Sequence, residues 1–335
     1  MALRLEDLMF IDDVMVKAQL AACLEVSGYP KPGNVHRLRD FPDTRFEHFI
    51  AGSIAIGPSI RASAFNGFRV GLNEVELNGI GVGSLIKGAV VNVKRFHSGG
   101  NTHLGVVTLF IPLAASAGMC FAKWHSLSEV NLKECFMRVV KSTTVRDALD
   151  FCEALRIAGV GGLGRIPISS MPDVTSWNVG DRIVEENFTL YDLMAFSSSW
   201  DLVASEFVNG LEIVFRVGYP SFLKFYDETG DINIAIVHAF LKLLSSKPDT
   251  FIARKFGLKT TSNIIEAVKI GLKFSEDVSR RAEEVLQLGG LSSVEGRREL
   301  LKLDEELAEM GLNPGSTADI LAASLFVAFL LGFKL

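Results

Sequence analysis

The chain has 335 residues, a length that allows one large domain or two of ordinary size. With 48% hydrophobic and 22% charged residues it cannot be an intrinsically disordered protein, and its net charge of −5 argues against nucleic acid as a partner. The four cysteines are far apart and lack zinc-site spacing, which indicates reduced thiols. The N-terminal segment does not have the pattern of a secretory signal, so we expect a cytoplasmic protein.

Apolar residues recur at spacings of three and four along most of the chain, which predicts helices. In chain order the predicted helices are 5–27, 45–65, 75–96, 104–122, 132–155, 189–217, 232–244, 262–288, 293–310 and 316–332. A strand-like pattern occurs at 182–189. The glycine- and proline-rich segment 159–184 is either a functional loop or a boundary between helical halves. We predict an all-α fold, a large multi-helix bundle with buried apolar central helices that forms a single domain over residues 1–335.

A membrane protein is the first alternative to weigh, because mean hydropathy is +0.29. The segment 104–122 has no charged side chain and is about long enough to span a bilayer. Pro112 lies in its middle, where it would kink a helix. A single span of this kind is more typical of a core helix in a large helical protein, so we expect no membrane association.

The segment 30–43, PKPGNVHRLRDFPD, is the first that suggests chemistry. Its prolines and glycine predict a stiff turn that gathers positive charge with carboxylates close behind. Cationic donors suit phosphate oxygens, and carboxylates suit a divalent metal. A solvated basic loop between helices would explain the same pattern. The candidate ligands here are Lys31, Gly33, Asn34, Arg37 and Asp43, with Glu25 one helical turn upstream.

The segment 97–105, HSGGNTHLG, leads directly into the apolar segment 104–122. A glycine pair at a helix start exposes backbone N–H groups at the positive end of the helix dipole, which is a ready anion site. An ordinary glycine turn with an N-cap at Asn101 or Thr102 is the alternative, and the two are compatible. His103 would lie within reach of a bound ligand. The candidate residues are Gly99, Gly100, Asn101, Thr102 and His103.

Two further turns precede helices in the second half of the chain. In 247–257, KPDTFIARKFG, Asp249 is placed to cap a helix from which Arg254 projects. In 312–319, LNPGSTAD, a proline-glycine turn leads into an apolar helix, with Asp319 near the helix start. A carboxylate inside such a helix requires a metal, a cation or a catalytic role.

The segment 159–164, GVGGLG, has the glycines of a dinucleotide-binding loop. It follows a helical pattern instead of a strand, and the residues after it do not begin a helix, so we reject a dinucleotide site. We expect a hinge or a substrate-lining loop.

These segments, in this order, resemble the triphosphoribosyl-dephospho-coenzyme A synthase family over about residues 8–330. The resemblance rests on Glu25 with PKPGNV, GGNTHLG, GGLG followed by Pro172-Asp173-Val174, DTFIARKFG and LNPGSTADILA. It implies an enzyme, a transferase that joins ATP to dephospho-coenzyme A and releases adenine. The family usually has a histidine-aspartate-methionine stretch where this chain has DFPDTRFEHF at 40–49. A carboxylate is kept at Asp40 or Asp43, but the histidine is kept only if His36 or His48 replaces it.

Because the chain departs from the family pattern at 40–49, the resemblance does not determine which acceptor substrate the protein uses. A paralogous enzyme that uses ATP or another phosphorylated ribose compound is one alternative, and a non-catalytic nucleotide-binding protein is another. Binding of Mg-ATP without release of adenine would identify the latter. The expected partners are ATP and dephospho-coenzyme A or a related phosphorylated small molecule. The oligomeric state is open, with a homodimer as one option.

The reaction implied by the resemblance requires a base for the acceptor hydroxyl, a donor for the departing adenine, and Mg²⁺ with cations for the triphosphate. The catalytic candidates are Asp43, His103, Asp249 and Asp319. His103 is the candidate proton donor to adenine, and the three carboxylates are candidates for the base and for the metal ligands. The substrate- and phosphate-binding candidates are Glu25, Lys31, Gly33, Asn34, Arg37, Gly99, Gly100, Asn101, Thr102, Arg254, Asn313, Gly315 and Ser316.

Overall fold

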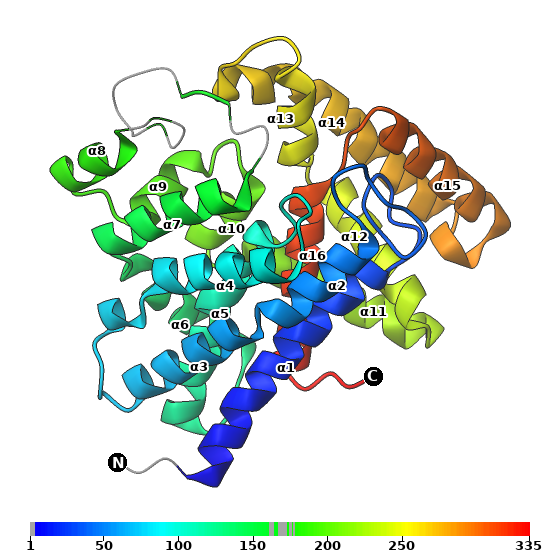
Figure 1. The fold of residues 1–335 in the computed structure, drawn as a ribbon. Coiled ribbons are helices and arrows are strands. Elements are labelled where there is room, and N and C mark those ends of the chain that lie inside the picture. The colour runs from blue at the N-terminus through cyan, green and yellow to red at the C-terminus, as the bar shows by residue number, and fades with distance from the viewer. Residues whose placement is uncertain (1–3, 161–163, 167–172, 174–175, 177) are drawn as a thin grey trace.

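Helices make up most of the described chain, as Figure 1 shows. This computed structural model describes residues 4–160, 164–166, 173, 176 and 178–335. The α-helices are α1 (Leu5–Ser27), α2 (Phe46–Ala55), α3 (Gly57–Gly71), α4 (Val82–Phe96), α5 (Leu104–Trp124), α6 (Glu129–Lys141), α7 (Val145–Ala158), α8 (Val179–Glu185), α9 (Leu190–Ser197), α10 (Leu202–Val208), α11 (Tyr219–Thr229), α12 (Ile232–Ser246), α13 (Thr250–Gly257), α14 (Ile264–Gln287), α15 (Val294–Glu309) and α16 (Gly315–Leu330). Short helices of other types are η1 (Leu77–Ile80), η2 (Val214–Gly218) and η3 (Gly290–Ser292). Within the described residues β-pairing is limited to two isolated bridges, so the all-α prediction is confirmed.

Local signals in the sequence explain where the helices begin and end. α1 ends at Ser27 as predicted, because the proline- and glycine-rich turn follows it. The predicted helix 45–65 is two helices, since Pro58, which has no N–H to donate, lies in the first turn of α3. The predicted helix 132–155 is also two, because the side chain of Thr144 caps the start of α7.

The predicted strand 182–189 is wrong. Its first residues belong to α8, and the chain then turns at Asn187, which has a φ of 57°. Thr189 follows as the N-cap of α9, where its side chain accepts a hydrogen bond from Asp192 N. The apolar residues that suggested a strand therefore lie in a short helix, where Ile183 is buried and Val184 is exposed, and in the turn after it.

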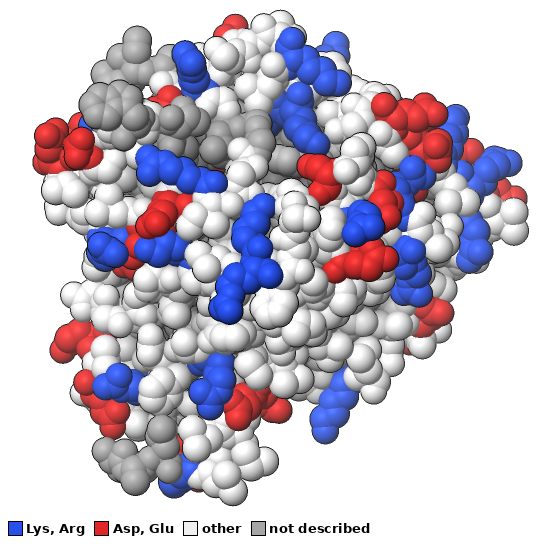
Figure 2. Space-filling model, viewed as in Figure 1, with Lys and Arg blue, Asp and Glu red and all other residues white. Residues whose placement is uncertain are grey.

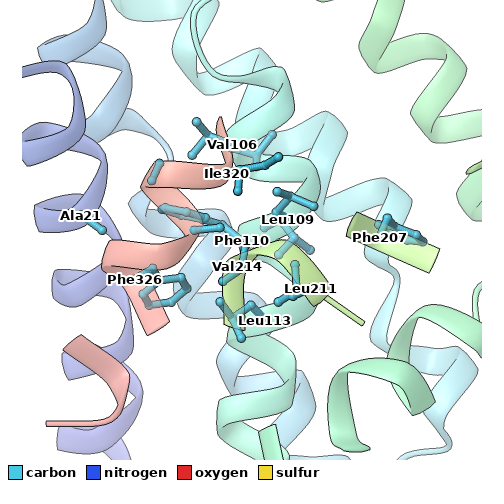
Figure 3. Packing of buried hydrophobic residues seen from close by; sticks show 14 of the residues in the cluster. Ala21, Val106, Leu109, Phe110, Leu113, Phe207, Leu211, Val214, Ile320 and Phe326 are labelled. Carbon is cyan, nitrogen blue, oxygen red and sulfur yellow. The ribbon is translucent and has the colours of Figure 1, made fainter. Parts of the chain in front are cut away.

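α5 forms the centre of the molecule, where its side chains pack with those of α1, α10 and α16 (Figure 3). Within the described residues it is the helix long and apolar enough to cross a membrane, and 89% of its most apolar 18-residue window is buried in the protein. The expected core helix is therefore confirmed. α5 continues through Pro112 as one helix. Its close packing with α3 requires glycine at Gly67 and Gly118, where a Cβ would lie about 2 Å from a backbone oxygen of the facing helix.

α5 and α16 run in parallel. The Phe110 and Phe326 rings lie 4.7 Å apart between centroids, and one to two turns earlier Asp319 lies against Gly105. The N-terminal ends of both helices therefore lie at the same end of the molecule, and their positive dipole ends lie together.

α1 runs in the opposite direction. Its early residue Phe10 stacks on Phe121, near the end of α5, with ring centroids 3.9 Å apart. Its late residue Glu25 lies close enough to Asp319 to affect the ionisation of that carboxyl. The C-terminal end of α1 thus meets the N-terminal ends of α5 and α16.

The face of the molecule in Figure 2 carries acidic and basic side chains interspersed. This mixture agrees with the small net charge of −5. No continuous basic surface covers the described residues of this face. An anionic ligand would therefore be attracted by a local arrangement of groups and not by a general field.

Candidate active site

A cavity of about 250 Å³ lies where α1 ends and where α5 and α16 begin. Its polar lining residues include Glu25, Asn34, Asn101, Thr102, His103, Asp201, Arg254, Asn313, Ser316 and Asp319. Its apolar wall comes mainly from α7, α9 and α10 and includes Phe151, Leu155, Leu193, Met194, Phe196, Trp200 and Val203. The turns that the sequence singled out therefore converge on one cavity.

The predicted site residues divide into two groups. Those that line the cavity are Glu25, Asn34, Asn101, Thr102, His103, Arg254, Asn313, Gly315, Ser316 and Asp319. Those outside its lining are Lys31, Gly33, Arg37, Asp43, Gly99, Gly100 and Asp249. Of the glycine-rich segment, residues 161–163, Pro172 and Val174 lie outside the described residues. Its described residues Val160, Gly164 and Asp173 line the cavity, as expected of a substrate-lining loop.

Asp319 lies at the first turn of α5. A Cβ on Gly105 would lie 2.0 Å from its Oδ2, so only glycine leaves room for this carboxylate. The backbone N–H of Val106 lies close enough to favour the charged form of the carboxylate. Burial and neighbouring carboxylates nevertheless raise the pKa of Asp319 well above its usual value. Those carboxylates are Glu25, Asp201 and Asp249. Asp319 is therefore more basic than an ordinary aspartate and faces the cavity.

Lys31 lies behind the cavity wall and forms a buried ion pair with Glu25. Its ammonium group also donates to the backbone oxygen of Glu25. Burial lowers the pKa of Lys31 and raises the pKa of Glu25. The prediction that Lys31 binds phosphate is not supported by this placement, because its charge is used inside the protein.

The rest of the 30–43 segment is fixed to α15 and α1. The buried carboxylate of Asp304 accepts hydrogen bonds from Gly33 N at 3.0 Å and Arg39 Nε at 3.0 Å. His36 Nε2 lies 3.3 Å from the same carboxylate. Arg37 Nε donates to Ser27 O at 2.7 Å, outside the cavity lining. The basic residues of this segment therefore anchor the turn. Gly33 and Arg37, which were predicted to bind substrate, do not line the cavity.

The 97–105 segment is held by a hydrogen-bond chain whose direction can be assigned. Gly99 N donates to His97 Nδ1 at 3.1 Å, so neutral His97 carries its proton on Nε2. That Nε2 lies 3.1 Å from Thr102 Oγ1 and donates a hydrogen bond to it. The hydroxyl of Thr102 is then free to donate to His103 Nδ1, 2.8 Å away.

The chain continues into α2. Ser53 Oγ donates its proton to Phe49 O at 2.8 Å. The contact of 3.1 Å between Ser53 Oγ and His103 Nε2 must therefore be donated by the histidine. Both ring nitrogens of His103 are used, and burial lowers its pKa to about 3. His103 is neutral, so the prediction that it protonates adenine is not supported. His103 positions the loop.

The predicted anion site at the glycine pair is also corrected. Gly99 N donates to His97, and Gly100 N donates to Asp43 O at 2.8 Å, so neither amide is available to an anion. Asn101 Oδ1 accepts from the backbone N of Leu104, the first residue of α5, at 3.2 Å, while His103 and not Asn101 or Thr102 occupies the N-cap position. Asn101 is thus the residue of this loop whose side-chain amide nitrogen is left for a ligand.

Asp249 is the N-cap of α13, as the sequence predicted, and it is fully buried. Its Oδ1 accepts from Phe251 N and Ile252 N, at 2.8 and 3.0 Å. Its Oδ2 accepts from Thr317 N and Oγ1, at 2.7 and 2.8 Å. These four bonds join α13 to α16, so Asp249 has a structural role and is not placed to act as a base.

The predicted metal centre of Asp43, Asp249 and Asp319 is not formed. Asp43 lies outside the cavity lining, and both oxygens of Asp249 hold helix ends. Among the residues that the structure describes, no group of three His, Cys, Asp or Glu side chains is arranged to hold a metal ion. The histidine missing from the family pattern is not replaced at the cavity either, since His36 and His48 do not line it.

The sequence reasoning missed Trp200 and Asp201, which line the cavity between α9 and α10. They lay inside the predicted helix 189–217, which the structure breaks at this point. The signal was the polar run Ser197-Ser198-Ser199 followed by Trp200 and Asp201, since such a run marks a loop and a following helix cap. Asp201 is indeed the N-cap of α10.

Comparisons with known proteins identify the family of the chain. The family model of ATP:dephospho-CoA triphosphoribosyl transferase matches residues 12–334. The 2-(5''-triphosphoribosyl)-3'-dephosphocoenzyme-A synthase of Klebsiella pneumoniae is 26% identical over 69% of this chain, and the chain spans 61% of that protein. The enzyme of that name from Escherichia fergusonii is 23% identical over 92% of this chain and 88% of its own length.

The fold has a counterpart among solved structures. The crystal structure of an Archaeoglobus fulgidus protein described as a triphosphoribosyl-dephospho-coA synthase has a TM-score of 0.54 to this chain, with 24% identity. It covers 83% of this chain and all of the archaeal one, so the two share their fold. The family match over nearly the whole sequence establishes that the chain belongs to the ATP:dephospho-CoA triphosphoribosyl transferase family.

Proposed function

We propose that this chain transfers the triphosphoribosyl group of ATP to dephospho-coenzyme A and releases adenine. The observation that supports this most strongly is the convergence of Asn101, Arg254 and Asp319 on one cavity from three distant segments. These residues supply an amide donor, a cation and a basic carboxylate. A nucleotide with a reacting ribose requires this combination.

The proposed reaction is a glycosyl transfer. The 2′-hydroxyl of dephospho-coenzyme A attacks the anomeric carbon of ATP's ribose, and the bond from that carbon to the adenine nitrogen breaks. Asp319 takes the proton of the attacking hydroxyl, and adenine leaves with the bonding electron pair and acquires a proton. The raised pKa of Asp319 makes it a stronger base than an exposed aspartate. The amide nitrogen of Asn101 is the donor that we assign to the departing base or the ribose.

The triphosphate is held in this proposal by Arg254 and by the N-terminal end of α16, where Gly315 and Ser316 line the cavity. Mg²⁺ would enter with ATP. Magnesium is usually held by one or two carboxylates together with substrate phosphates, and the lining carboxylate Glu25, whose Oε1 pairs with Lys31, would offer its Oε2. When bound, the metal neutralises charge on the triphosphate.

The departure from the family pattern at 40–49 does not favour a different acceptor. Phe49 is the residue of this stretch that lines the cavity. Asp40 instead accepts a hydrogen bond from Phe46 N at 2.9 Å, at the start of α2. The altered residues therefore lie behind the reacting centre. We also propose a cytoplasmic location, because all four cysteines are free and three of them are buried. A homodimer stays a prediction.

The test is incubation with Mg-ATP and dephospho-coenzyme A, with free adenine followed by chromatography. We expect adenine only when both substrates are present, in equal amount to the triphosphoribosylated product found by mass spectrometry. ATP binding without adenine in the complete mixture would instead identify a non-catalytic nucleotide-binding protein. Adenine that forms only with a different acceptor would identify a paralogous enzyme.

A further inference from the structure

Trp200 is an aromatic side chain that the structure holds rigidly at the cavity. Its backbone N–H donates to Ser197 O at 3.1 Å, and the next residue, Asp201, donates to the same oxygen at 3.0 Å. The indole packs at a right angle on the ring of Phe196, with centroids 4.9 Å apart. It also packs against a small apolar cluster that includes Ile264. The part of the indole that these contacts leave uncovered faces the cavity.

Arg254 lies beside Trp200 and has an unused binding edge. Its Nη1 donates to Asp201 Oδ2 at 3.3 Å, and its guanidinium lies 4.9 Å from the centre of the Phe251 ring. Its Nε is buried and has no hydrogen-bond partner among the residues that the structure describes. A buried N–H without a partner is rare in proteins and calls for an explanation.

The geometry of the guanidinium group indicates what would satisfy this N–H. Nε and Nη2 point along the same edge, which binds two oxygens of a phosphate or carboxylate side by side. Asp201 holds Nη1, the nitrogen on the other side, and so keeps that edge free. Because Asp201 directly follows Trp200, it also fixes the free edge relative to the indole.

We propose that Trp200 and Arg254 form a recognition site for an adenine nucleotide. The indole stacks on the purine, and the free edge of Arg254 binds a phosphate of the same nucleotide. Every base presents a π-face, and stacking on tryptophan is a general way to hold it. The choice of adenine rests on the proposed function, in which both ATP and dephospho-coenzyme A carry this base.

The test compares ligands that have and lack the base. The affinities of Mg-ATP, dephospho-coenzyme A and Mg-tripolyphosphate are measured by calorimetry for the whole protein and for Trp200→Leu, Trp200→Phe and Arg254→Lys. We expect Trp200→Leu to weaken nucleotide binding by about 5- to 150-fold and to leave tripolyphosphate binding unchanged. Trp200→Phe should retain most of the affinity. Arg254→Lys should weaken ATP and tripolyphosphate alike, because lysine lacks the two-nitrogen edge.

Trp124→Phe is the matched control. Trp124 ends α5, about 24 Å along the helix from Thr108, the last residue of α5 that lines the cavity, so this variant should bind every ligand as the wild type does. Tryptophan fluorescence adds a measurement that needs no destabilising change: Mg-ATP or dephospho-coenzyme A should quench the wild type and not Trp200→Phe. Mg-tripolyphosphate, which has no base to stack on the indole, should quench either protein less than the nucleotides quench the wild type.

The ligand arms identify the source of the base. A loss confined to ATP assigns the site to the donor, and a loss confined to dephospho-coenzyme A assigns it to the acceptor. The inference is overturned if Trp200→Leu weakens tripolyphosphate as much as the nucleotides, or if it changes none of the three. Adenine release by the wild type is scored separately, so a wild type that binds both nucleotides through Trp200 without turnover contradicts only the proposed function.

Discussion

Two turns of this protein both have sequences that suggest a phosphate site, but they have different roles in the structure. The turn at 30–39 is rich in proline, glycine and basic residues, and the turn at 97–103 is rich in glycine, histidine and amide residues. In the first turn Lys31 forms a buried ion pair with Glu25, and the buried carboxylate of Asp304 accepts hydrogen bonds from Gly33 and Arg39. In the second turn Asn101, Thr102 and His103 line the cavity.

The difference shows that charge in a loop does not by itself indicate a ligand. The basic turn follows α1 and must be attached to α15, and ion pairs achieve this attachment. The second turn is held by hydrogen bonds between the neutral side chains of His97, Thr102 and His103. Asn101 of this turn accepts from Leu104 N and lies at the cavity. The following changes would break or sharpen this contrast.

The largest effect on the rate of adenine release is expected from Asp319→Asn, a residue next to the second turn. The amide has nearly the same shape but cannot take a proton, so adenine release should fall by about 10²- to 10⁴-fold. Thermal unfolding should remain close to that of the wild type, because removing one of several neighbouring negative charges relieves repulsion. A folded Asp319→Asn enzyme with turnover within tenfold of the wild type would contradict the assigned base.

Lys31→Met should act on stability. Removing one partner of the buried pair leaves Glu25 uncompensated, which costs about 3–5 kcal/mol of unfolding free energy, measured by urea denaturation. The double variant Lys31→Met with Glu25→Gln should recover much of this loss, since both charges are then gone. If Lys31→Met keeps full stability and only weakens ATP binding, the first turn is a phosphate site after all.

The neutral hydrogen-bond chain predicts a pH effect. His103 has a pKa of about 3 in the fold, whereas its unfolded value is near 6.5. The unfolded chain therefore binds a proton first as the pH falls, so stability decreases below pH 6.5 and continues to decrease toward pH 3. Between pH 6.5 and pH 5 the loss from this residue is about 2 kcal/mol.

The measurement for this effect is urea denaturation at pH 7 and pH 5 for the wild type and for His103→Asn. The variant lacks the titrating ring, so its stability should fall less between the two pH values. Equal losses in both proteins would show that His103 is not held neutral by the fold.

The smallest effects compare one residue from each turn. Asn101→Ala should raise the KM for ATP by about 2- to 10-fold, because a hydrogen bond to the base or the ribose is lost. Arg37→Gln in the first turn should change it less than about twofold, since Arg37 lies outside the cavity and donates to Ser27 O. Steady-state kinetics decides the comparison, and a larger effect of Arg37→Gln would reverse the roles of the two turns.

The sequence predicted the helical class and several helix ends because those depend on local signals. α1 stops where proline begins, and Asp249 caps α13 through its own next residues. It also identified Asp319, since a carboxylate at the start of an apolar helix is costly to bury without a purpose.

The roles of Lys31, Gly33 and His103 could not be predicted in the same way. Asp304, which accepts a hydrogen bond from Gly33, lies 271 residues further along the chain. Ser53, which accepts a hydrogen bond from His103, lies 50 residues before that histidine. A local pattern shows which groups are charged or polar but not whether a protein partner satisfies them. Trp200 was missed for a different reason: the polar run before it marks a loop, but its apolar neighbours suggested one continuous helix over 189–217.

The most direct test of the central claim is a structure of Asp319→Asn with Mg-ATP and dephospho-coenzyme A bound. We predict that the triphosphate lies against Arg254 and the start of α16, with the anomeric carbon of ATP's ribose and the acceptor's 2′-hydroxyl next to residue 319. A nucleotide bound instead over the 30–43 segment, with its phosphates on Arg37 or Lys31, would contradict the account.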